Sequence, residues 1–196
     1  MDFSEKILKE YRIKADRQLV HTCRWMMFWI CLVLFLNCTN VFILDKRSMI
    51  IWTLISCIVY FIPTFYCDIL KRENTVMARY VYLTILVIHA GIQVALLTYH
   101  TIIMLLFPLV VSCLYNKKCY VKYTTFISIP MIWIGHLLSA VMCIVPNEPL
   151  RNMKQILLHG ALPRTIEFIA IVVICRYISG RIEEILNTFI GNLLSL

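Results

Sequence analysis

The sequence predicts an all-α membrane protein, a six-transmembrane-helix bundle with a helical C-terminal extension. Of its 196 residues, 61% are hydrophobic and only 15% charged, and the mean hydropathy is +0.80, whereas a soluble domain needs far more polar surface. Apolar runs of about 20 residues alternate with short charged segments, which is the pattern of helices that cross a bilayer. The runs lack the alternation over about ten residues that a membrane β-barrel requires.

Charged residues delimit most of the spans. Asp45 follows the first apolar run, and Lys71 follows the second. We expect spans at about residues 25–44, 48–70, 77–97, 101–116, 123–145 and 163–179, within a transmembrane bundle of residues 23–180. Residues 1–22 combine helix-forming residues with interleaved charge, and no Gly or Pro separates them from the first span. They are therefore expected to form a cytoplasmic helix that continues into it.

The middle of the chain needs two crossings. Residues 80–116 contain no Lys, Arg, Asp or Glu, and as one helix they would be about 55 Å long, against a hydrocarbon core of about 30 Å. Arg79 precedes the run and Lys117 follows it, and cations favour the cytoplasmic side. Both ends should then lie on one side, which requires an even number of crossings with a turn near residues 98–101.

The distribution of cations predicts the orientation. All but five of the 19 Lys and Arg residues fall on one side of the bundle in this arrangement. The five exceptions are Lys46, Arg47, Arg151, Lys154 and Arg164. The side that is rich in Lys and Arg should be cytoplasmic, so both termini are expected in the cytoplasm. The bundle is expected in the plasma (inner) membrane. Orientation then accounts for the net charge of +8 without a nucleic-acid partner.

Polar residues within the spans suggest a binding site. His89 and Gln93 lie one helical turn apart on one face of span three, and polar groups inside a bilayer usually face other helices or a wet cavity. We take as candidates for a ligand pocket in the outer half of the bundle His89, Gln93, Tyr99, His100 and His136. The alternative is that these residues form hydrogen bonds that join the helices, worth about 0.6–2 kcal/mol each. The histidines have no acidic partners or tight ligand cluster, so neither a metal nor another cofactor is expected.

Charged side chains near the membrane surfaces suggest ion pairs. Arg164 and Glu167 are three residues apart at the start of span six and are expected to pair on the outer rim, either as an anchor or as a ligand contact. Near the inner face we expect ion pairing around Asp68 among Arg24, Asp68, Arg79 and Arg176. The nine cysteines form no CxxC motif and mostly lie in apolar runs, so we expect structural roles, with an outer bridge such as Cys38–Cys143 left open.

Two segments outside the spans have helical periodicity. In the outer loop, Leu150, Met153, Ile156 and Leu157 recur at helical spacing, which is typical of a helix lying in the membrane interface, either as a lid or as a simple connection. At the C-terminus, residues 181–196 form an amphipathic helix. Its apolar stripe is Ile182, Ile185, Leu186, Phe189 and Leu193. The acidic polar face favours pairing with a second copy over binding to anionic lipid.

No catalytic motif is present. The sequence has no phosphate-binding Gly-rich loop, no HExxH, no GxSxG and no pair of inward carboxylates. A Cys/His membrane peptidase is disfavoured, because "HAGIQVALLTYH" places no cysteine after His89. The residues present are therefore not expected to be an enzyme.

Two sequence segments resemble a known class of membrane domain. "LLTYHTIIMLLFPLVVSCLY" and "LPRTIEFIAIVVICRYISGRIEEIL" resemble the multi-pass N-terminal sensory domains of modular bacterial signalling proteins, which precede diguanylate cyclase, histidine kinase or PP2C-like phosphatase domains. The positions that carry it are Leu97, Thr98, Tyr99, His100, Pro108, Tyr115, Pro163, Arg164 and Glu167. The resemblance implies a cytoplasmic output domain, either attached beyond residue 196 or on a separate chain, and the helix that stops at Leu196 favours attachment.

These observations predict a sensor or input module. Its expected partners are the lipid bilayer, a second copy of the chain, the output domain and an unknown small ligand. Span six would pass the state of the outer pocket to the cytoplasmic helix. A small transporter or channel component is the first alternative, although no internal repeat is evident and the five glycines are few. An integral membrane enzyme acting on lipid or peptide is the second.

Overall fold

The computed structural model describes residues 3–41, 45–71, 75–97, 104–141 and 152–194. Within these ranges the chain is helical and has no strand. The elements are α1 (Phe3–Cys38), α2 (Lys46–Thr64) with the π-helix η1 (Phe65–Ile69), α3 (Val76–Leu97), α4 (Phe107–Cys113), α5 (Lys118–Val141), α6 (Met153–Gln155) with the π-helix η4 (Ile156–Ala161), and α7 (Leu162–Leu194). The prediction of an all-α fold is confirmed.

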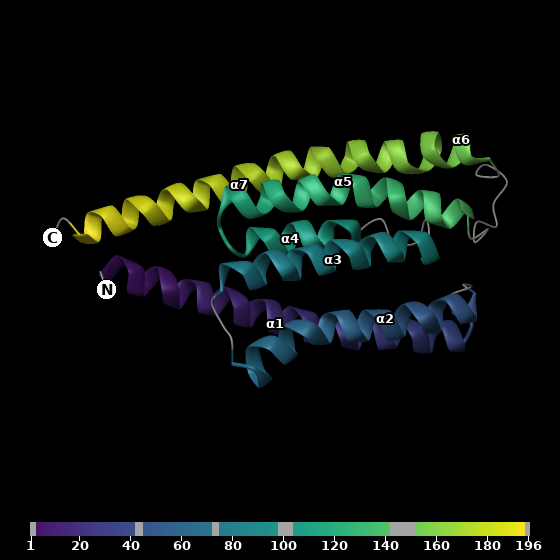
Figure 1. Ribbon diagram of the computed structural model, residues 1–196, viewed down its shortest axis with the longest axis horizontal. Helices are drawn as coiled ribbons and strands as arrows, with labels where there is room; N and C mark the ends of the chain where they lie inside the picture. The colour runs from purple at the N-terminus through teal and green to yellow at the C-terminus, as the bar shows by residue number, and fades with distance from the viewer. Residues whose placement is uncertain (1–2, 42–44, 72–74, 98–103, 142–151, 195–196) are drawn as a thin grey trace.

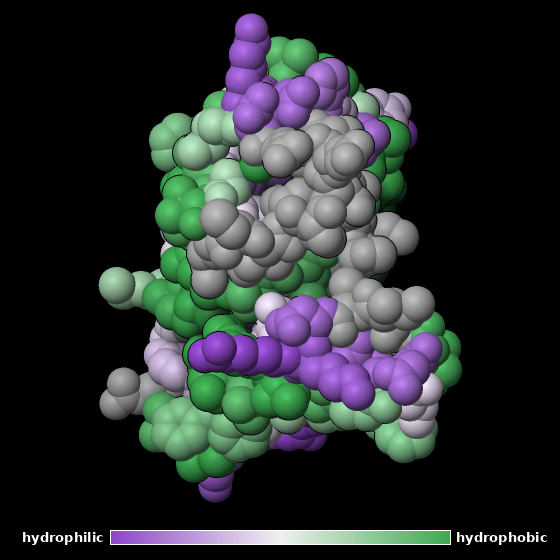
Figure 2. All heavy atoms as spheres, turned by 90° about the vertical axis from the view of Figure 1, so that its right-hand side faces the viewer, coloured by the Kyte–Doolittle hydropathy of each residue, from purple (hydrophilic) through white to green (hydrophobic). Residues whose placement is uncertain are grey.

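The helices lie side by side in an elongated bundle, and each element from α1 to α7 runs opposite to the one before it if the short α4 is counted and α6 is taken together with α7, so that the long helices α3 and α5 run in the same direction (Figure 1). Both termini lie at the same end of the bundle, which we call the terminal end. The other end, where α1 meets α2 and where α6 begins, is called the opposite end. Seen from the opposite end, the flanks of the molecule are apolar, and hydrophilic side chains gather on the end face over the α1–α2 pair and over α6–α7 (Figure 2).

Five helical segments are long and apolar enough to cross a membrane, as expected for a multi-pass membrane protein. They are Lys9–Cys38, Lys46–Ile69, Val76–Leu97, Lys118–Val141 and Met153–Asn192. The expected fourth span is represented by a shorter apolar helix, Met104–Cys113, which is about 15 Å long at 1.5 Å per residue. This is half of the hydrocarbon thickness of about 30 Å, so the count of six crossings stays a prediction.

The first and last helices are longer than the spans expected from sequence. Helix α1 has 36 residues and passes through position 22 without a break, and it ends at Cys38 rather than near residue 44. Asn40 then adopts a left-handed conformation with φ of 61°, which asparagine tolerates better than most residues. Helix α7 has 33 residues, so the expected span six and the C-terminal amphipathic helix are one continuous rod of about 50 Å.

Helix α3 lies between two apolar cores. One core joins it to α1 and α2 and includes Leu19, Met49 and Leu83. The other joins it to α4, α5 and α7 and includes Val94, Leu109, Val121, Ile132 and Phe168.

Helices α3 and α5 cross at two glycines. A Cβ atom added at Gly135 would lie 2.7 Å from the carbonyl oxygen of Gly91, so the two backbones approach as closely as small residues allow in membrane bundles.

Candidate functional site: buried polar clusters

His89 is buried between α3 and α2. Its Nε2 atom lies 2.7 Å from Ser56 Oγ, and the Ser56 hydroxyl is also 2.7 Å from the carbonyl oxygen of Trp52, one turn earlier in α2. The ring of Tyr60 packs edge-on against the imidazole with centroids 5.0 Å apart. Both Ser56 and His89 are at most 2% exposed. We call Trp52, Ser56, Tyr60, His89 and Gln93 the His89 cluster.

The His89 cluster offers neutral hydrogen-bonding groups. Gln93 is one turn beyond His89 on the same face of α3 and is 2% exposed. The indole N–H of Trp52 and the hydroxyl of the neighbouring Thr53 are buried and have no hydrogen-bond partner among the described residues. Buried polar groups normally find partners, so this cluster has the capacity to hydrogen-bond a small uncharged molecule or water.

His136 forms a second polar contact, on α5. Its Nδ1 atom is 2.7 Å from the carbonyl oxygen of Ile132, and its Nε2 atom is 2.6 Å from Nη1 of Arg164 on α7. A carbonyl can only accept and a guanidinium can only donate. The arrangement therefore requires the neutral imidazole with its proton on Nδ1, so that Nε2 accepts from Arg164. Both side chains are buried.

The π-helix η4 fits closely over this contact. A Cβ atom added at Gly160 would lie 2.8 Å from His136 Cδ2 and 3.3 Å from Arg164 Nη1, so only glycine leaves room for both side chains. π-Helical turns are rare and are often found at functional sites. Beside the contact, Arg164 and Glu167 line a small cavity of about 40 Å³ between α7 and the turn that precedes α4. Arg164 thus turns inward to His136, while Glu167 is exposed at the surface.

The candidate pocket residues fall into two sites on different sides of α3. At about 100° per residue, His89 and Gln93 lie roughly opposite Gly91 on the helix. Gly91 contacts α5 and His89 contacts α2. His136, on α5, meets η4 and α7 instead. Tyr99 and His100 lie outside the described residues.

A buried ion pair lies nearer the terminal end. Nε and Nη2 of Arg79 on α3 lie 3.1 and 3.2 Å from the two carboxylate oxygens of Asp16 on α1. Both side chains are at most 3% exposed. The guanidinium carbon lies 5.4 Å from the centroid of the Tyr115 ring, a cation–π geometry, and Tyr115 in turn packs against Tyr120. This network joins α1, α3 and α5 with the segment after α4.

Asp16 was not among the residues singled out from sequence. It lies on the buried stripe of α1 formed by Ala15, Leu19 and Cys23, so its position at helical spacing among apolar residues was the available signal. Of the residues expected to pair around Asp68, Arg24 forms an ion pair with it, Arg79 is held by Asp16 instead, and Arg176 is exposed.

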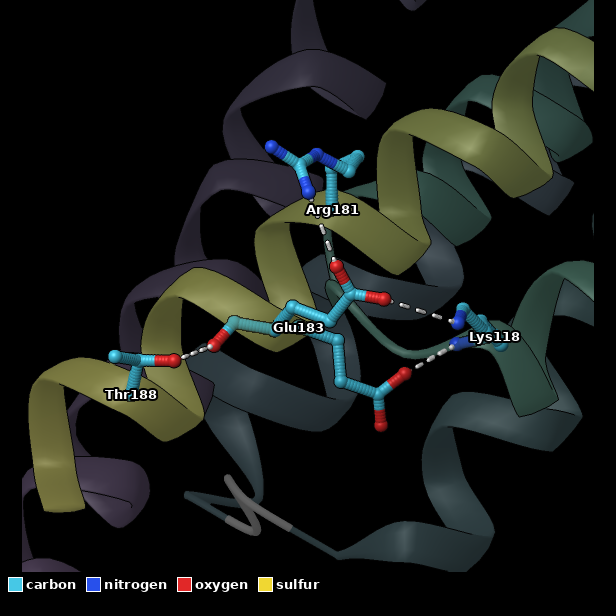
Figure 3. A network of polar contacts seen from close by, with 5 residues as sticks. Lys118, Arg181, Glu183 and Thr188 are labelled. Carbon is cyan, nitrogen blue, oxygen red and sulfur yellow. Dashed lines mark hydrogen bonds and ion pairs between the residues drawn. The ribbon is translucent and has the colours of Figure 1, made fainter.

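A fourth polar network joins α7 to the first residue of α5 at the terminal end (Figure 3). The backbone N–H of Lys118 donates to Glu183 Oε2 at 3.2 Å, and its Nζ lies 3.9 Å from Glu184. Arg181 also contacts Glu184, at 3.3 Å. The stem of Lys118 crosses α7 over Gly180, where a side chain would clash with it.

The C-terminal stripe is partly exposed beyond this network. Ile182 and Leu186 are half-buried, whereas Ile185 is 61% and Phe189 58% exposed. The side chain of Leu193 lies outside the described part of the structure.

Comparison with known proteins gives no match: no family model, no curated protein and no solved structure resembles the chain closely enough to count as one. Within the residues that the structure describes, no group of three or more His, Cys, Asp and Glu side chains is arranged to hold a metal ion. The buried polar contacts and the helices that carry them are therefore the features that bear on function.

Proposed function

We propose that the chain is a transmembrane sensor module of the bacterial inner membrane that passes a change at its outer side to the cytoplasm through α7. The observation that carries the proposal is the continuity of this helix. Arg164, which contacts His136, lies in its first turn, and Glu183 and Glu184, which contact Lys118, lie in the same unbroken helix about five turns later.

The proposed orientation has six crossings with the terminal end in the cytoplasm. The alternating direction of successive elements and the position of both termini at one end favour it (Figure 1). So does the excess of Lys and Arg toward that end, because cations favour the cytoplasmic side. In this orientation the His136–Arg164 contact belongs to the outer half of the bundle and the Lys118–Glu184 contact to the inner surface.

The signal in this proposal is a two-state change in the position of α7. A ligand or a proton shifts such an equilibrium only by interacting differently with the two states. Protonation of His136 meets this condition, because Nε2 would then carry a hydrogen directed at the Arg164 guanidinium, and the two groups would repel. The His89 cluster, with its neutral donors and acceptors, is the proposed site for an uncharged small ligand, and Tyr99 and His100 remain candidates for it.

The output in this proposal is a cytoplasmic domain, attached or separate, driven by a pair of α7 helices. Ile178, Ile182, Ile185 and Phe189 are spaced by four, three and four residues, which is the repeat of a coiled-coil seam. Exposed apolar side chains on a helix outside the membrane usually mark an interaction site. The same seam of a second copy of the chain would bury them.

The test compares the wild-type protein with His136→Gln, which keeps a hydrogen-bond acceptor but does not titrate. Both are placed in lipid nanodiscs, and hydrogen exchange of residues 181–194 is measured from pH 7.5 down to pH 4.5. We expect the acid-induced loss of protection to be roughly tenfold greater in the wild type, since a hydrogen bond to a charged group is worth about 1.5–3 kcal/mol. Equal behaviour of the two proteins would refute the proposed route through α7.

A second function is favoured by one observation. The described part of the helix Met104–Cys113 covers only about half of the hydrocarbon thickness and is largely buried by the other helices. Transporters often contain short, discontinuous helices of this kind near their substrate sites. In a transporter, substrate flux into liposomes would depend on the His89 cluster. Substrate flux without any change in the hydrogen exchange of residues 181–194 would favour transport over sensing.

A further inference from the structure

A small cavity lies beside Arg164 in the first turn of α7. It has a volume of about 40 Å³ and is lined by six residues of α7 and of the turn that precedes α4: Leu105, Leu106, Arg164, Glu167, Phe168 and Ile171. Arg164 is 6% exposed, and its Nη1 atom lies 2.6 Å from Nε2 of His136. Glu167 is exposed at the surface. We call this hollow, which adjoins both the buried arginine and the exposed glutamate, the Arg164 cavity.

The spacing of Arg164 and Glu167 on α7 suits an ion pair. Residues that are three apart on a helix are neighbours on one face. The same helix contains such a pair in the same order, because Arg181 contacts Glu184, three residues later, at 3.3 Å. The Arg164 cavity is larger than the roughly 10–15 Å³ that one water molecule needs, so there is room beside Arg164 for its guanidinium to shift. Glu167 is therefore a second acceptor within reach of Arg164.

The protonation state of His136 decides which acceptor is the stronger. While the imidazole is neutral, its Nε2 atom accepts from Arg164, and a hydrogen bond from a charged donor in a buried site is worth more than an ion pair at an exposed surface. A protonated imidazole carries a hydrogen on both nitrogens and accepts no hydrogen bond. The contact inside the bundle is then lost, and the carboxylate of Glu167 is the better acceptor.

The elements around His136 offer few other charged groups. Those packed against α5 are α3, α4, η4 and α7. Among the described residues near His136, α7 contributes Arg164 and Glu167, and η4 contributes His159, which is exposed. His89 on α3 faces α2 instead, and α4 has no charged residue. Of these described groups, Glu167 is the one with a carboxylate, so it is the partner for a displaced guanidinium.

We propose that Arg164 occupies two positions: it donates to His136 in one state and forms an ion pair with Glu167, beside the Arg164 cavity, in the other. In the first position Arg164 joins α7 to α5. In the second position both partners belong to α7, so this link between the two helices is absent. The inference rests on the proposed response of His136 and adds Glu167 as the positioning residue that receives the arginine. It supplies the differential interaction that a two-state change requires.

The first test uses no change of pH. His136→Leu removes the inner acceptor, and a double-mutant cycle with Arg164→Gln and Glu167→Gln measures their coupling from the unfolding equilibrium constant in mixed micelles. We expect a coupling of roughly two- to fivefold in the His136→Leu background and none where His136 is present. The Arg181–Glu184 pair is the matched control and should show the same coupling in both backgrounds. Equal coupling of Arg164 and Glu167 in the two backgrounds, zero included, would overturn the proposal.

The second test follows hydrogen exchange of residues 181–194 in nanodiscs as the pH falls from 7.5 to 4.5. Glu167→Gln removes the receiving charge, so the rise in exchange should be roughly threefold smaller than in the wild type. Glu10→Gln, which removes an exposed carboxylate of α1, is the control and should respond as the wild type does. An equal response of Glu167→Gln and the wild type would reject the role of Glu167. A wild type without any response, combined with the expected coupling in the first test, would refute the route from His136 through α7 and leave the two positions of Arg164 standing.

Discussion

The protein buries an arginine near each end, and the two are held by different chemistry. At the terminal end, Arg79 donates hydrogen bonds from two nitrogens to the Asp16 carboxylate, and its guanidinium lies over the Tyr115 ring. Toward the opposite end, Arg164 donates to an imidazole nitrogen of His136 under a π-helical turn. A carboxylate accepts two hydrogen bonds from one guanidinium, whereas an imidazole exchanges its accepting lone pair for a hydrogen on protonation.

This difference separates a fixed part of the bundle from a part that can respond. Breaking a buried ion pair leaves a charge uncompensated, which is among the most costly local changes in a protein. The buried Asp16–Arg79 pair therefore joins α1 firmly to α3. The His136–Arg164 hydrogen bond requires the neutral imidazole, so under the proposed function it is this contact between α5 and α7, and not the Asp16–Arg79 pair, that would respond to a proton.

The largest expected effect follows removal of one partner of the fixed pair. Asp16→Ala should lower the free energy of unfolding by about 3–5 kcal/mol, because Arg79 would remain buried without its carboxylate. The measurement is unfolding of the purified protein in mixed micelles with increasing denaturing detergent. Replacing both partners, as in Asp16→Leu with Arg79→Met, should recover much of the loss.

A matched control lies on the same helix. Glu10 and Lys14 form an ion pair at 3.2 Å with both side chains at least 67% exposed, and exposed pairs contribute about 0–1 kcal/mol. Glu10→Ala should therefore be nearly neutral. If Asp16→Ala were equally mild, the idea that this pair fixes α1 to α3 would be wrong.

A smaller effect is expected at the responsive contact. Gly160→Ala places a methyl group against His136 and Arg164, and overpacking of this kind costs about 1–3 kcal/mol, partly offset by the gain of about 1 kcal/mol in helix propensity. Stability should fall, and hydrogen exchange of residues 181–194 at neutral pH should rise, as the proposed function also expects for the wild type in acid.

The control for this variant is also a glycine-to-alanine change. A Cβ atom at Gly191 would meet nothing within 4 Å, so Gly191→Ala should show only the favourable change in propensity, up to about 1 kcal/mol. If hydrogen exchange of residues 181–194 rose no more in Gly160→Ala than in Gly191→Ala, η4 would have no part in the proposed signal.

The sequence was sufficient for the helical class, because the lengths of the apolar runs are set by the thickness of the bilayer. It was also informative about buried polar positions: His89, Gln93, His136 and Arg164 were all singled out, and all are buried. Polar residues in long apolar runs are conspicuous, since few other reasons keep them there.

The partners of these residues were harder to foresee. Ser56 is an ordinary residue in a membrane helix and gives no sign that it faces His89. Whether His136 faces His89 or Arg164 depends on how α5 is rotated relative to its neighbours, and that rotation follows from the Gly91–Gly135 crossing rather than from the periodicity of one helix. Asp16 is different, because its place on an apolar stripe could have been read from the sequence.

The smallest expected effect lies at the turn before α2, outside both buried arginines. Asp45 caps α2 by accepting a hydrogen bond from the backbone N–H of Ser48 at 2.8 Å, and this bond is the main reason that the pKa of the Asp45 carboxyl lies below its ordinary value. A lowered pKa means that the ionised form stabilises the fold. That contribution is complete above the ordinary value of about 3.9 and is lost as the pH falls through the lowered pKa of the folded state.

Asp45→Ala should therefore be slightly less stable than the wild type by a constant amount from about pH 5 to pH 8, a range well above the carboxyl pKa. The difference should shrink as the pH falls below about 4. Asp45→Asn should remain close to the wild type in the neutral range, because asparagine caps helices about as well as aspartate. Thermal unfolding in micelles across this pH range gives the measurement. A difference that instead grew in acid would show that the carboxyl group stabilises α2 in its protonated form, so that this end of the bundle would contain an acid-dependent contact in addition to the one proposed at His136.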